Sequence, residues 1–166
     1  MITIVPYNEA WPSAFQSEAE LIRSALGPLA RRVEHVGSTS IPGISAKPVI
    51  DIQVSVPTLE PLSTYVQSLF TLCYTHFALG DFDLTYPFFQ KPGTWPSTHH
   101  VHLCVEGSDL ERKHFKRYRG TSPQRDHFLP VICNQLFHSG VVRIIQSEAP
   151  RRPCEALNRV ADHARG

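Results

Sequence analysis

The chain has 166 residues, of which 42% are apolar and 19% are charged, a length and composition typical of one globular domain. Sixteen Lys and Arg residues against 15 Asp and Glu residues give a net charge of +1, which argues against a duplex nucleic acid as partner because such binding depends on a basic excess. No segment approaches the ~18 consecutive apolar residues of a membrane span, and residues 1–13 lack the pattern of a signal peptide. We therefore expect a cytoplasmic protein without a membrane partner.

The first predicted elements are a helix and two strands. Apolar residues recur at steps of three and four over residues 9–26, which predicts an amphipathic helix. Residues 31–36 are a short strand candidate that runs into a small polar turn. Residues 49–56 alternate apolar and polar side chains, which predicts a half-buried strand with Asp51 and Gln53 on its polar face.

The rest of the periodic region predicts a helix, three strands and a last helix, at residues 58–70, 72–78, 84–90, 98–105 and 108–119. The last helix begins with a capping box, in which a Ser is followed three residues later by a Glu. Beyond residue 119 no period is sustained.

The turn after the first strand is the clearest candidate for a ligand site. Gly37 lets the backbone turn tightly, and the hydroxyls of Ser38, Thr39 and Ser40 with nearby backbone amides can hold phosphate oxygens. Asp51 on the following strand can hold Mg²⁺, which bridges the same phosphates. The alternative is an ordinary polar turn beside a charge at a strand end.

Three stretches resemble the GrpB family: Val5 to Phe15 with its Val-Pro-Tyr and Trp-Pro pairs, Glu34 to Ile52, and Thr98 to Leu103. That family is assigned to the nucleotidyltransferase superfamily, and its domain also occurs fused to dephospho-CoA kinase. The resemblance implies an α/β (α+β), nucleotidyltransferase-like fold, with a mixed sheet of about four to five strands and helices packed mainly on one face. It implies a domain at residues 1–119, followed by a poorly matched and partly disordered tail at residues 120–166.

The resemblance also implies roles for individual residues. Gly37 and Ser38 would form the phosphate turn, Lys47 would reach an anionic ligand, and Asp51 would be the first carboxylate of a Mg²⁺ site. Superfamily enzymes place a second carboxylate two residues after the first, but this chain has Gln53 there. An amide neutralises no metal charge, so the resemblance supports the fold more strongly than the reaction.

Histidines form the second candidate cluster. His100 and His102 share one face of their strand, so they could bind phosphate or join Asp51 in a metal site. His35 precedes the polar turn and is expected to point into the same cleft. The alternative is that all three are structural histidines held by hydrogen bonds.

Three functions remain open on this sequence. The first is nucleotidyl transfer from a nucleoside triphosphate with Mg²⁺, with Asp51 and Lys47 as catalytic residues. The second is a degenerate domain that binds a nucleotide or another small phosphorylated ligand without chemistry. The third is a metal-dependent hydrolase built on histidines. The acceptor and the oligomeric state are not determined by the sequence.

Overall fold

The computed structural model describes residues 3–112, which form a five-stranded mixed sheet with two α-helices. The elements in chain order are α1 (Trp11–Leu26), the short 3₁₀ helix η1 (Gly27–Leu29), β1 (Arg32–Val36), η2 (Ser38–Ser40), β2 (Ile50–Val56), α2 (Leu62–Phe70), β3 (Thr75–Phe77), η3 (Gly80–Leu84), β4 (Phe88–Lys91) and β5 (His99–Val105). The strand order is β1-β2-β5-β4-β3, with β2 and β5 parallel and the other neighbours antiparallel. The predicted fold class is confirmed; the tail at residues 120–166 lies outside the described residues.

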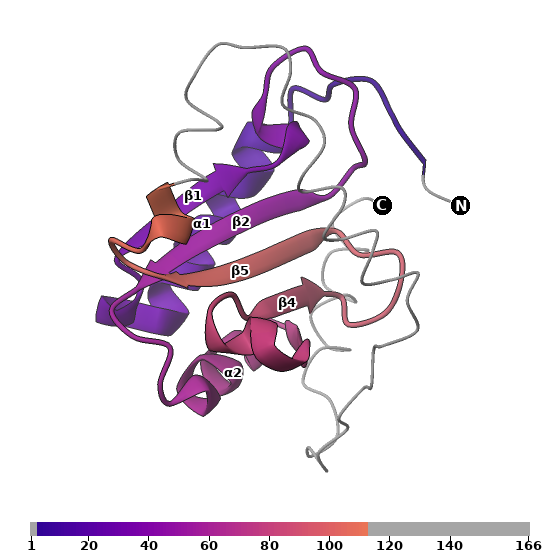
Figure 1. The fold of residues 1–166 in the computed structure, drawn as a ribbon. Helices are drawn as coiled ribbons and strands as arrows, with labels where there is room; N and C mark the ends of the chain where they lie inside the picture. Colours follow the sequence, from indigo (N-terminus) through magenta and orange to yellow (C-terminus); the bar gives the residue numbers. More distant parts are fainter. Residues whose placement is uncertain (1–2, 113–166) are drawn as a thin grey trace.

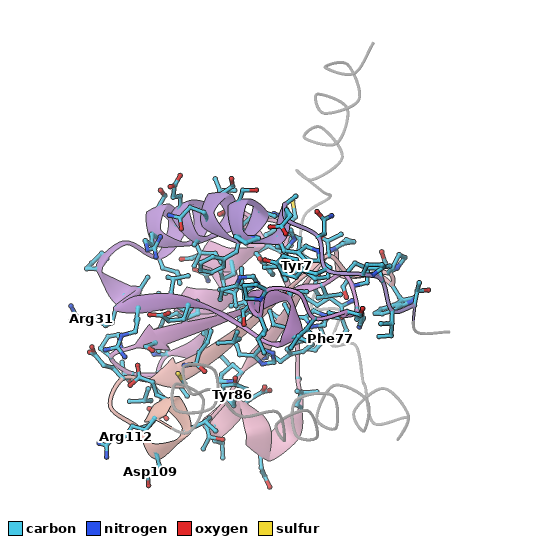
Figure 2. The ribbon with its side chains drawn as sticks, turned by 90° about the horizontal axis from the view of Figure 1, so that it is seen from above. Tyr7, Arg31, Phe77, Tyr86, Asp109 and Arg112 are labelled. Atoms are coloured by element: carbon cyan, nitrogen blue, oxygen red, sulfur yellow. The ribbon has the colours of Figure 1, made fainter. Side chains whose placement is uncertain are left out.

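Both α-helices cover one face of the sheet, as predicted (Figure 1). The apolar stripe of α1 packs against β1 and β2, and it forms one core together with the apolar side chains of β2 and β5. Burial of such a stripe is the main stabilisation of an amphipathic helix. Figure 2 shows Tyr86, Asp109 and Arg112 on the side of the sheet opposite α1.

The strand β2 lies between β1 and β5, and this position corrects the expectation of a half-buried strand. Gln53 and Ser55, which belong to its polar face, are each only 1% exposed. Alternation in the sequence distinguishes the two faces of a strand but does not say whether the polar face is covered. The polar face of this sheet is therefore buried at its centre.

One strand boundary near the site differs from the prediction, and one helix start agrees with it. The strand expected at residues 84–90 begins only at Phe88, because Gly80–Leu84 form η3. A helix begins at Asp109 as the capping box predicts, and the Glu111 amide donates to Ser108 Oγ at 3.2 Å. The Glu111 carboxylate, however, accepts a bond from the Gly107 amide at 2.7 Å. The remainder of that helix lies outside the described residues.

Within residues 3–112, no helix has both the length and the apolar character needed to cross a membrane. The expected cytoplasmic location stays a prediction.

Candidate functional site

Several of the predicted site residues meet at one edge of the sheet, on the right in Figure 1, where β1 and β4 end and β2 and β5 begin. In the register of the sheet, Asp51 lies between Val36 of β1 and His100 of β5, and His100 also faces Gln90 of β4. Their side chains share the face opposite the helices, because residues directly opposite in paired strands point the same way. The loops that leave this edge carry the remaining candidates.

Gly37 and Asp51 are in direct contact at this edge. The backbone of Gly37 has φ +75° and ψ −178°, a conformation that is essentially restricted to glycine. A Cβ atom at this position would lie 2.5 Å from Asp51 Oδ2 and 3.0 Å from Asp51 Cβ. Glycine therefore serves two purposes here, since it permits the turn and leaves room for the carboxylate against the backbone.

The turn after Gly37 uses two of its three hydroxyls to hold itself together. Ser40 Oγ donates to the Gly37 carbonyl at 2.7 Å, and Thr39 Oγ1, on a residue only 1% exposed, donates to the Val49 carbonyl at 3.1 Å. Both side chains were predicted to bind phosphate, but the structure gives them these bonds within the protein. Within the described part of the chain, the Ser38 hydroxyl has no hydrogen-bond partner, so it is the hydroxyl of the three that remains available to a ligand.

Asp51 is held by a chain of two hydrogen bonds. His100 Nδ1 donates to Asp51 Oδ1 at 3.1 Å, and the Ser97 hydroxyl donates to His100 Nε2 at 2.8 Å. The same order of groups occurs in serine hydrolases, where the serine attacks the substrate. Ser97 is only 4% exposed, so a substrate cannot reach it, and we assign its hydroxyl to holding the orientation of His100. Ser97 was not predicted as a site residue, because the sequence marks it only by its place just before the strand that carries His100 and His102.

The charge of Asp51 is stabilised by its surroundings. Burial by itself would raise the pKa of Asp51, but the hydrogen bond from His100 opposes this effect, and so does the electrostatic influence of His100, His102 and Lys47. Together they hold the pKa of Asp51 below its usual value. Because of this lowered pKa, the carboxylate is ionised at neutral pH. Its side chain is 26% exposed and therefore open to solvent on one side.

His102 and Gln53 lie one step further into the sheet on the same face, directly opposite each other in β5 and β2. The His102 ring stacks on Tyr86 with the ring centres 4.8 Å apart, and it also contacts Phe88 at 5.0 Å. Gln53 is 1% exposed, and its Oε1 atom has no hydrogen-bond partner among residues 3–112. The structure thus places both residues next to Asp51 and His100, but they are buried in the sheet.

His35 does not lie on this face. It stands opposite Ile52 in the sheet and stacks on Phe15 of α1, with the ring centres 4.8 Å apart and the planes 9° apart. Its Nε2 atom donates to Thr39 Oγ1 at 3.1 Å. Burial lowers the pKa of His35 to about 4, and the charge of Asp51 offsets only part of that effect. The expectation that His35 points into the cleft is therefore not met, because it is displaced by one residue from the face that carries Val36.

Lys47 lies beside an aromatic ring that the sequence analysis did not select. Its ammonium group is 4.1 Å from the centre of the Trp95 ring, a cation–π distance. Trp95 belongs to the loop between β4 and β5 and is 48% exposed. The influence of Lys47 on the pKa of Asp51 places its charge within reach of the same edge.

The donor atoms present do not fit a metal centre built by the protein alone. Among residues 3–112, no three His, Cys, Asp or Glu side chains are grouped as metal ligands. Asp51 Oδ1 and both ring nitrogens of His100 are engaged in hydrogen bonds, and Gln53 carries no charge. If a cation such as Mg²⁺ is bound here, Asp51 is the residue that would hold it, and a bound ligand would supply the other oxygen atoms.

The chain resembles known proteins over most of its described length. Residues 1–120 match the family described as GrpB protein. UPF0157 protein YqkA of Bacillus subtilis is 33% identical over 138 residues, which cover 81% of this chain and 39% of that protein. UPF0157 protein PA4798 of Pseudomonas aeruginosa is 40% identical over 105 residues, which cover 61% of this chain and 43% of that protein. The chain therefore spans less than half the length of these two relatives.

Two further similarities concern an enzyme and a solved structure. A protein of Mycolicibacterium paratuberculosis named dephospho-CoA kinase is 38% identical over 76 residues, which cover 44% of this chain and 19% of the kinase. The crystal structure of the conserved protein GrpB from Enterococcus faecalis has a TM-score of 0.62 at 30% sequence identity, and the match covers 70% of each chain. The second similarity agrees with the fold described above.

Proposed function

Since this chain belongs to the GrpB family, we propose that it binds a nucleotide through its phosphate groups at the sheet edge formed by Gly37, Lys47 and Asp51. The observation that carries the proposal is the contact between Gly37 and Asp51, which brings the polar turn and an ionised carboxylate together. The positive charge of the Lys47 ammonium group also influences Asp51. Relatives named dephospho-CoA kinase, which contain a segment like this chain, support a nucleotide-related role.

Each group contributes differently to binding a phosphate. The Lys47 ammonium attracts the anion directly, and the Ser38 hydroxyl offers a donor. Asp51 repels phosphate unless a cation lies between the two, and Mg²⁺ held by Asp51 together with the ligand would supply that charge. His100 keeps the Asp51 carboxylate in place through its Nδ1–H.

Binding without nucleotidyl transfer is the function that this geometry favours. Two-metal transfer chemistry depends on several anionic ligands. Among the described residues, no group of three potential metal ligands accompanies Asp51 at this edge, and the position of the expected second carboxylate holds the neutral, buried Gln53. A hydrolase built on His100 lacks a basis too, because both of its ring nitrogens are already hydrogen-bonded.

The test of binding is titration calorimetry with ATP, with and without Mg²⁺. Lys47→Met removes the charge at similar length and should weaken ATP binding by about 10-fold or more, the value of a hydrogen bond to a charged group. Lys47→Arg is the matched control and should retain most of the affinity. Equal affinity in Lys47→Met and the wild type would contradict the proposed site.

The role of Asp51 has a test that depends on sign. With Mg²⁺ present, Asp51→Asn should weaken ATP binding, because the bridging cation is lost. With a chelator present, the same substitution should strengthen binding, because a repulsive charge is removed. An unchanged affinity under both conditions would exclude Asp51 from the site. If the wild type transfers an α-labelled nucleotide to an acceptor and Asp51→Asn does not, the conclusion that the chain binds a nucleotide without catalysing its transfer would be overturned.

A further inference from the structure

The loop at residues 92–97 is fixed at both ends but presents an exposed aromatic ring between them. The Thr98 amide donates to the Lys91 carbonyl at 2.8 Å and closes the loop, and Ser97 is buried in its bond to His100. Near the other end, a Cβ on Gly93 would overlap Thr75 Oγ1, so the backbone packs tightly against β3. Trp95 nevertheless remains 48% exposed.

The position of this ring relative to the phosphate-binding edge gives it a use. Lys47 is 4.1 Å from the ring centre, so a cation that attracts phosphate and an aromatic surface lie side by side. Ser97, two residues after Trp95, is joined through His100 to Asp51. A nucleotide carries a flat base and a phosphate chain in one molecule, and aromatic rings bind bases by stacking with little dependence on which base it is.

We propose that Trp95 is the surface on which the base of the bound nucleotide stacks, while Lys47 and the turn after Gly37 hold its phosphates. This inference rests on the proposed function and adds that the ligand has an aromatic base and is not a bare phosphate compound. Lys47, held over the Trp95 ring, links the two halves of the site.

The experiment compares two ligands that share a phosphate chain and differ in the base. ATP and inorganic tripolyphosphate are titrated by calorimetry, with Mg²⁺, into the wild-type protein, Trp95→Leu and Leu84→Ala. Leu84 is a matched control because it is an exposed apolar side chain, 73% exposed, on the separate helix η3. Stacking of one base corresponds to a change in affinity of about 5-fold to 150-fold. The wild type should prefer ATP by that factor, and Trp95→Leu should lose the preference while Leu84→Ala keeps it.

Tryptophan fluorescence gives a second readout. The chain has two tryptophans, and Trp11 is only 6% exposed in the core. ATP should therefore quench the emission of Trp95, and tripolyphosphate should leave it nearly unchanged.

Each contrary outcome has its own meaning. Equal binding of ATP and tripolyphosphate would overturn the stacking proposal and leave the phosphate site intact. An equal loss for both ligands in Trp95→Leu would also overturn it, since the ring would then act only by holding Lys47. Failure of both ligands to bind the wild type would overturn the proposed function together with this inference.

Discussion

Replacing Gly37 by Ala tests whether the turn and the Asp51 carboxylate are in contact. The backbone at Gly37 has φ +75° and ψ −178°, and holding a residue other than glycine there costs about 1–3 kcal/mol. The new Cβ would also lie 2.5 Å from Asp51 Oδ2, and forcing an extra carbon into a packed site costs about 1–3 kcal/mol more. The expected loss of unfolding free energy is therefore about 2–6 kcal/mol, a large part of the roughly 5–15 kcal/mol of a typical domain.

Gly27→Ala is the matched control. Gly27 has φ +54° and ψ −131°, which is also unfavourable for Ala, but a Cβ there would meet no atom within 4 Å. Its loss should therefore be confined to the backbone cost of about 1–3 kcal/mol. Both variants are measured by urea unfolding monitored by circular dichroism. Equal losses in the two variants would refute the argument that Gly37 is required by its contact with Asp51.

Three further predictions concern buried polar groups away from the proposed ligand. Glu111→Ala should cost about 3 kcal/mol of unfolding free energy in urea, because this carboxylate is 3% exposed and accepts three hydrogen bonds. Arg32→Ala removes only a half-exposed partner of Glu111 and should cost less than about 1 kcal/mol. Similar losses in the two variants would contradict this ranking. The pKa of His35 is lowered from 6.5 to about 4 in the folded protein, so the unfolded chain binds more protons between these two pH values. The free energy of unfolding should therefore fall as the pH drops through that window, by at most about 3 kcal/mol. Urea midpoints measured from pH 7 to pH 4 should fall less in His35→Gln than in the wild type, and an identical fall would refute the assignment. Glu18→Gln should lower the free energy of unfolding by about 2–4 kcal/mol in thermal unfolding, because Glu18 is 6% exposed and its two oxygens lie 2.9 and 3.1 Å from Lys91 Nζ. A loss below about 0.5 kcal/mol, as for an exposed pair, would count against a buried ion pair.

Local patterns were sufficient to predict most of the elements around the site. The alternation in residues 49–56 predicted both the strand β2 and the shared face of Asp51 and Gln53, because the two-residue period of a strand is a property of the backbone. The same reasoning placed His100 and His102 on one face of β5. The residues themselves also predicted the turn after Gly37, and the family resemblance implied its role in holding phosphate; the structure places this turn against Asp51.

His35 shows where such reasoning stops. It lies next to the polar turn in the sequence, but neighbouring residues on a strand point to opposite faces of the sheet. Which face is lined by α1 depends on how the helix packs, and this packing sets His35 against Phe15. Proximity in the sequence was therefore a poor guide to membership of the site.

The sequence by itself determined the helices, the strands and the presence of Asp51 and Lys47 near a glycine turn, since these follow from short-range periodicity and residue type. Only the tertiary structure decided that β2 pairs in parallel with β5, from a segment about fifty residues away, as their register shows. That pairing brings His100 to Asp51 and the loop with Ser97 and Trp95 to the same edge. Strand pairing across such a distance depends on burial of the whole core, which no local pattern of residues encodes.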